Sequence, residues 1–120
     1  MACLYSFNLD QGSDVSLPFR LRNKEGNSLD LSGYSVRMEI RKSISSPDVV
    51  DKLSSGNGRI TIEPQEGRFT CKFPNAITEQ YPAQTLYYDI EIVSKLGMVT
   101  RVIEGKIKVI PEVTRGEFFL

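Results

Sequence analysis

The sequence predicts an all-β fold, either a sandwich or a barrel of short strands. Apolar and polar residues alternate along most of the chain, and turn-forming residues recur about every 8 to 12 residues. Only one short stretch carries a helical pattern. The length of 120 residues suits a single domain with one core, and 40% apolar with 25% charged residues are ordinary values for a globular protein.

The strongest strand signal is a hairpin from Tyr87 to Val109, turning at Lys95-Leu96-Gly97. Its first strand alternates apolar with acidic residues, and its second carries an apolar row that Arg101 and Gly105 interrupt. The residues expected to face inward are Leu86, Tyr88, Ile90 and Ile92 on the first strand, and Val99, Ile103, Ile107 and Val109 on the second.

Further strands before this hairpin bring the expected total to about seven to eight. Their expected ranges are 4–10, 14–22, 34–42, 49–53, 59–63 and 68–73. Pro18 predicts an edge or a bulge in the second of them, because proline cannot donate a ladder hydrogen bond. Leu29 and Leu31 are expected to pack beneath the sheet, and residues 74–82 are the one place where we expect a helical turn.

Catalytic and metal-binding signatures are missing from the sequence. There is no histidine, which removes the usual general base, the usual zinc ligand and any Ser-His or Cys-His pair. Cys3 and Cys71 lack CxxC spacing, and no glycine-rich phosphate loop is present. We therefore expect no catalytic residue, no cofactor, no metal and no enzyme activity. Both cysteines are expected to be free thiols, with Cys71 in a strand core, which favours synthesis in a reducing cytoplasm.

Several charged residues admit a functional interpretation. Asp89 and Glu91 share the outer face of one strand, where a glycosidase pair or a calcium site is the alternative to solvated ion pairing. A glycosidase needs two carboxyl groups that face each other across a cleft, whereas these two lie side by side. We therefore favour ion pairing, with Arg101 as a partner across the hairpin.

Two other sets of charged residues also admit a functional interpretation. Four carboxylates in or near loops lack the spacing of a calcium-binding loop; these are Asp10, Asp14, Asp48 and Asp51. Three cations occupy alternate positions, namely Arg20, Arg22 and Lys24. They could bind a phosphate or an acidic partner, but we favour a solvent-facing row.

The chain termini are unusually apolar. We divide the chain into a β-sandwich domain, 1–115, and an apolar tail, 116–120, which ends in Phe118-Phe119-Leu120. Chain ends are usually polar and loose, so this tail is expected to dock either on its own domain or on a neighbouring subunit. Leu4 and Tyr5 are expected to add to the sheet edge of a neighbour. These five residues are the candidate partner-binding residues.

Charge and hydropathy narrow the class of partner. Fifteen basic and fifteen acidic residues cancel, which argues against a general nucleic-acid binder and favours association. No segment approaches the roughly 18 to 20 apolar residues that span a bilayer. The first five residues lack the basic and apolar regions of a signal peptide. We expect no nucleic acid, membrane or small-molecule substrate as a partner.

Six motifs in order along the chain carry a family resemblance. They are Tyr5-Ser6-Phe7-Asn8-Leu9-Asp10-Gln11-Gly12, the segments 30–41 and 57–62, Tyr88-Asp89-Ile90-Glu91, Val99-Thr100-Arg101 with Gly105, and the segment 109–115. On these motifs the sequence resembles small virion proteins of tailed bacteriophages, including the N-terminal domain of phage baseplate upper proteins. The apolar residues 116–120 depart from the family pattern.

The resemblance implies an immunoglobulin-like antiparallel β-sandwich that serves as a non-catalytic building block of the phage tail, baseplate or neck. It implies a homo-oligomer in contact with other virion proteins, assembled in the host bacterial cytoplasm and located in the virion. The alternative is a carbohydrate- or receptor-binding module of a phage fibre. Such modules usually stack sugars on exposed aromatic residues, often tryptophan. This chain has no tryptophan.

Overall fold

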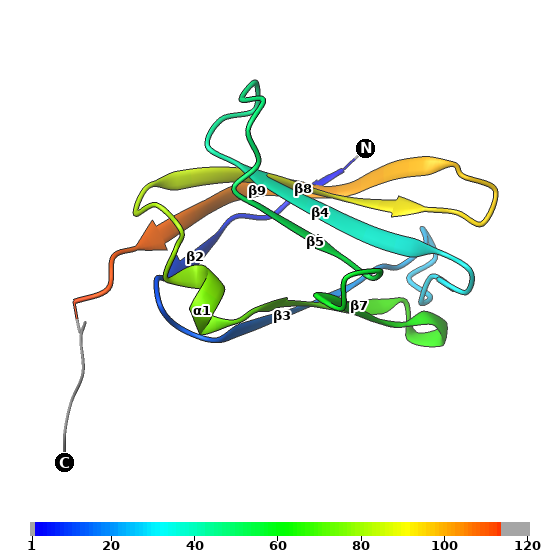
Figure 1. The fold of residues 1–120 in the computed structure, drawn as a ribbon. Helices are drawn as coiled ribbons and strands as arrows, with labels where there is room; N and C mark the ends of the chain where they lie inside the picture. The colour runs from blue at the N-terminus through cyan, green and yellow to red at the C-terminus, as the bar shows by residue number, and fades with distance from the viewer. Residues whose placement is uncertain (1, 114–120) are drawn as a thin grey trace, which may run out of the picture.

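Two β-sheets pack face to face in a computed structural model that describes residues 2–113 (Figure 1). The larger sheet contains β1 (Cys3–Leu4), β2 (Phe7–Asp10), β4 (Ser35–Arg41), β5 (Asp51–Ser54), β8 (Thr85–Val93) and β9 (Val99–Ile110). The smaller sheet contains β3 (Val15–Arg20), β6 (Ile60–Glu63) and β7 (Arg68–Phe73). The short helices η1 (Pro64–Glu66) and α1 (Asn75–Thr78) complete the elements. The predicted all-β sandwich is confirmed.

The strand order is that of an immunoglobulin-like sandwich. The larger sheet runs β1-β9-β8-β4-β5, with β2 also on β9, and the smaller runs β3-β7-β6. In immunoglobulin terms β3, β7 and β6 take the places of strands B, E and D, and β4, β8 and β9 those of C, F and G. All pairs are antiparallel except β1 and β2, which run parallel to β9. The boundary at residue 115 lies outside the described residues.

Alternating residues of both sheets form one core. The predicted inward rows of β4, β7 and β8 are buried: Val36, Met38, Ile40, Phe69, Cys71, Phe73, Leu86, Tyr88, Ile90 and Ile92. Leu31 is buried beneath the sheets, and α1 forms within the predicted stretch 74–82. Pro18 lies on β3, an edge strand, which is where a residue without a backbone N–H is tolerated.

A β-bulge overturns part of the predicted hairpin pattern. Ile90 pairs with Ile103, but Glu91 pairs with Arg101, so Val102 is an extra residue on β9. An extra residue reverses which side chains face inward. Val99 therefore lies on the outer face rather than the predicted inner face, and Arg101 continues an outward row instead of interrupting an inward one.

The N-terminal strand crosses β9 very closely at Gly105. A Cβ atom on Gly105 would lie 1.9 Å from the carbonyl oxygen of Tyr5. Tyr88 pairs with Gly105 across the ladder, and its hydroxyl donates a hydrogen bond to that same carbonyl. The strand is interrupted there, so the expected 4–10 strand is two strands, and residues 2–113 contain nine strands in place of the expected seven to eight. The register nevertheless continues, with Leu4 opposite Glu104 and Phe7 opposite Ile107.

An ion pair with little solvent exposure links the two sheets. Asp51 of β5 accepts hydrogen bonds from Arg59, just before β6, at 2.8 and 3.2 Å. The hydroxyl of Tyr81, after α1, donates to the same carboxylate, and burial raises the pKa of Tyr81. Because β5 and β6 belong to different sheets, this cluster connects the two layers.

Replacing Gly105 with alanine should destabilise the protein by roughly 1 to 3 kcal/mol, because the added methyl group must displace the Tyr5 backbone. Urea unfolding measures the loss. Gly56→Ala is the matched control, since its Cβ would meet only the Ser54 hydroxyl at 3.7 Å, and it should change stability by less than about 0.5 kcal/mol. Equal stabilities for the two variants would contradict the close crossing.

Asp51→Asn should lower the free energy of unfolding by about 3 kcal/mol, because it leaves the Arg59 guanidinium without a balancing charge in a poorly hydrated site. The comparison is Glu91→Gln, which breaks the exposed pair of Arg37 and Glu91 and should lose about 1 kcal/mol at most. Thermal and urea unfolding at neutral pH test both. A loss for Asp51→Asn no larger than that of Glu91→Gln would contradict the assigned role of the pair of Asp51 and Arg59.

Candidate interaction surface

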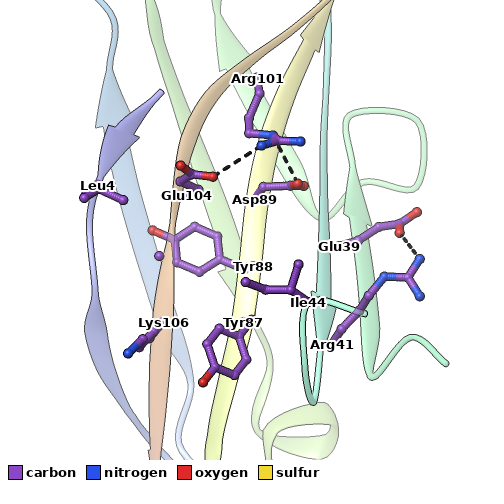
Figure 2. A pocket seen from close by; sticks show the side chains of 11 residues that line it. Leu4, Glu39, Arg41, Ile44, Tyr87, Tyr88, Asp89, Arg101, Glu104 and Lys106 are labelled. Carbon is purple, nitrogen blue, oxygen red and sulfur yellow. Dashed lines mark hydrogen bonds and ion pairs between the residues drawn. The ribbon is translucent and has the colours of Figure 1, made fainter. Parts of the chain in front are cut away.

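The outer face of the larger sheet carries a groove of about 370 Å³ (Figure 2). Its floor is made by Tyr87 and Asp89 of β8 and by β9 from Glu104 to Lys106. Leu4 of β1 flanks it on one side, and Ile44, in the loop between β4 and β5, flanks it on the other. The groove thus draws on four separate segments, which the sheet order places next to one another.

Ion pairs cover the floor of this groove. Arg101 lies between two carboxylates, with Nε 3.4 Å from Asp89 Oδ2 and Nη1 3.4 Å from Glu104 Oε2. At the other side Arg41 pairs with Glu39 at 2.7 Å. The expected pairing of Arg101 with Asp89 across the hairpin is confirmed. Such exposed pairs contribute only a few tenths of a kcal/mol each, so they set the charge pattern of the face more than its stability.

Asp89 lies beside both like and opposite charges on this face. Burial raises the pKa of Asp89, the neighbouring Glu91 raises it further, and Arg101 opposes both. Glu91 itself is held by Arg37 at 2.8 Å. The two carboxylates lie side by side on an open face, which suits contact with a cationic or polar group of a partner rather than acid–base chemistry across a cleft.

The other charged candidates are dispersed. Asp14 accepts hydrogen bonds from the backbone and side chain of Asn75, and Asp51 is held by Arg59. Within residues 2–113 no three acidic or cysteine side chains gather closely enough to hold a metal ion. Of the three alternating cations, Arg20 approaches Glu66 and Arg22 donates to the carbonyl of Gly26, so they are held by the chain itself.

The structure places the predicted partner-binding residues apart. Leu4 is 82% exposed at the groove, whereas Tyr5 is 44% exposed and packs its ring against Phe7 and Phe19 at the edge of the core. Phe118, Phe119 and Leu120 lie outside the described residues. Leu4 is therefore accessible at the surface, and Tyr5 anchors the N-terminal strand through its ring contacts.

Exposed apolar residues at the β8–β9 tip and at Ile44 were not predicted. Leu96, Met98 and Val99 are exposed where the hairpin projects from the sandwich (Figure 1). The sequence carries a signal for the tip residues, because apolar residues are unexpected in a turn, but a turn signal alone does not indicate exposure. Ser94 holds the turn, since its backbone N–H donates to the Met98 carbonyl and its hydroxyl accepts from the Met98 N–H.

No protein-family model and no curated protein matches this sequence. Among residues 2–113, the helices are too short to cross a bilayer.

The pKa of Asp89 is predicted to lie above the ordinary value of 3.8, and Glu91→Gln should lower it by removing a like charge. A carboxyl group whose pKa is raised on folding lowers the free energy of unfolding as pH rises through the window just above 3.8. In Glu91→Gln this decrease should be smaller. NMR titration of the side-chain carboxyl measures the pKa. Glu25→Gln, in a separate exposed turn, should leave it unchanged. A wild-type pKa at or below 3.8 would contradict the assignment.

Proposed function

We propose that this protein is a structural virion protein of a tailed bacteriophage, a non-catalytic building block of the tail, baseplate or neck that assembles through protein–protein contacts. The observation that carries the proposal is where the exposed large apolar side chains lie. Four of them, Leu4, Ile44, Leu96 and Met98, lie on β1, on the β4–β5 loop and at the β8–β9 tip. The ordered sequence resemblance to phage virion proteins supports the same role.

The charge pattern supports a scaffold more than a catalyst. The carboxylates near the groove are paired with arginines, and Asp89 has Arg101 beside it. A virion subunit needs surfaces that neighbours cover, and obligate contacts of that kind bury on the order of 2,000 Å² or more. We propose copies of the same chain and other virion proteins as those neighbours.

The thiols fit assembly in the host cytoplasm before incorporation into the virion. Cys3 is exposed and Cys71 is buried, and neither forms a disulfide within the described residues. Burial raises the pKa of Cys71 to about 12, so this thiol stays protonated and unreactive at neutral pH.

The groove supports one alternative function, a carbohydrate- or receptor-binding module. Tyr87 lies in the groove beside Asp89, an arrangement in which an aromatic ring and a carboxylate contact a sugar. The Lys106 ammonium, however, lies 5.8 Å from the centre of the Tyr87 ring and covers one of its faces. Binding of the monomer to a glycan array, lost in Tyr87→Ala, would favour this alternative over the scaffold.

Removing residues 118–120 should leave the fold intact and abolish incorporation into particles, because residues 2–113 already form one buried core. Circular dichroism and thermal unfolding test the fold, and immunogold labelling of purified particles of the encoding phage tests incorporation. A variant with Phe118, Phe119 and Leu120 all changed to serine keeps the length and should behave like the deletion. Loss of the folded state would show instead that the tail belongs to the core. A full-length protein absent from particles would contradict the proposed function.

A further inference from the structure

The β8–β9 tip is an apolar projection with a defined shape. Leu96 is 97% exposed and Met98 is 72% exposed, on a turn that Ser94 holds by hydrogen bonds at both its backbone and its hydroxyl. The strands that lead to it are the longest in the protein, and the tip stands clear of the smaller sheet (Figure 1). A projection of this kind presents its apolar side chains in a fixed arrangement, which favours docking into a matching hollow.

The groove on the outer face has apolar sides that an apolar projection can contact. Its two sides are the exposed apolar residues Leu4 and Ile44, and Tyr87 lies on its floor (Figure 2). The charges on the floor balance, because the three carboxylates are matched by three cations; these are Glu39, Asp89 and Glu104 with Arg41, Arg101 and Lys106. The lining as a whole is therefore neutral and repels neither sign of charge.

The tip cannot reach this groove within one molecule. The floor is built from β8 and β9, the same two strands that the tip joins. Asp89 lies five residues before Ser94 along a continuous strand, a separation of about 17 Å at the usual rise. Folding the hairpin back would break its pairing with β4, which holds β8 from Tyr87 to Val93. Any contact between the two surfaces must join two copies of the chain.

A positive charge on the tip and a carboxylate in the groove favour one orientation of this contact. Lys95 is exposed and is the only charged residue of the turn from Ser94 to Met98. Its stem lies beside Gly33, and among the described residues it forms no ion pair. Asp89, in the groove, shares one arginine with Glu104, so an incoming ammonium group would find a carboxylate that is only partly compensated.

We propose that the β8–β9 tip of one copy binds in the outer-face groove of a second copy, forming a head-to-tail contact. The two surfaces differ, so each copy offers one tip and one groove, and the contact repeats until the chain of subunits closes into a ring or grows as a filament. Its use in assembly rests on the proposed virion function, whereas the contact itself is a property of the isolated protein.

The test is self-association of the full chain, measured by analytical ultracentrifugation from micromolar to millimolar concentration. The tip variant is Leu96→Ser with Met98→Ser, and the groove variant is Leu4→Ser with Ile44→Ser. Each should weaken association by about tenfold or more, because each removes two exposed apolar contacts. Val113→Ser changes an exposed apolar residue outside both surfaces and should have no effect. All five side chains are exposed, and thermal unfolding checks that every variant folds.

Mixing the two variants gives the sharpest result. The tip variant keeps its groove and the groove variant keeps its tip, so together they should form a one-to-one dimer and nothing larger. Lys95→Glu should weaken wild-type association at low salt and have less effect at high salt.

Three results would overturn the proposal. A wild-type protein that is monomeric throughout the concentration range excludes the contact. A groove variant that associates normally indicates a tip-to-tip contact. Loss of self-association on deletion of residues 118–120, with tip and groove intact, makes the tail the occupant instead. A monomeric protein that is nevertheless present in particles refutes this contact alone, and a self-associating protein absent from particles refutes the virion role alone.

Discussion

The fold depends on the parallel pairing of the first ten residues with β9. This pairing places Phe7 and Leu9 over the core, and without it the inner face of β9 would lose its neighbour at the edge of the larger sheet. It is possible only because residue 105 has no side chain, which lets the Tyr5 carbonyl approach the β9 backbone. That carbonyl occupies the position that a side chain at 105 would fill, and the Tyr88 hydroxyl donates a hydrogen bond to it.

The same pairing determines the outer surface. Leu4 flanks the groove because the register with β9 continues unbroken through the interruption at Tyr5 and Ser6. On the other side of β9, the bulge at Val102 brings Arg101 to the outer face, where it meets Asp89 and Glu104. Two features of β9 thus shape the groove. Gly105 admits the N-terminal strand that carries Leu4, and the extra residue Val102 brings Arg101 to the outer face.

Local patterns were sufficient to predict most of the strands. The rows of β4, β7 and β8 follow a strict period of two, and Pro18 correctly indicated an edge strand, because each of these signals depends only on neighbouring residues. The nine-strand count and the parallel N-terminal pairing were not predictable in this way, since the contact of Tyr5 with Gly105 joins positions a hundred residues apart.

The bulge and the groove were missed for related reasons. A one-residue insertion leaves the alternation intact on each side, and its only trace in the sequence was that Arg101 interrupted an apolar row. The groove needs the sheet order, because it combines β1, the β4–β5 loop, β8 and β9. The apolar tip was visible in the sequence as Leu96-Gly97-Met98, but turn chemistry alone does not say that a turn projects away from the domain.

We propose that this protein is a scaffold whose function lies in contacts between copies rather than in chemistry at a site. A cryo-electron microscopy reconstruction of the intact particle tests this most directly. We expect the sandwich in several copies around the tail, baseplate or neck, with the β8–β9 tip of each copy on the outer sheet face of the next. A particle without density for this sandwich would contradict the central claim.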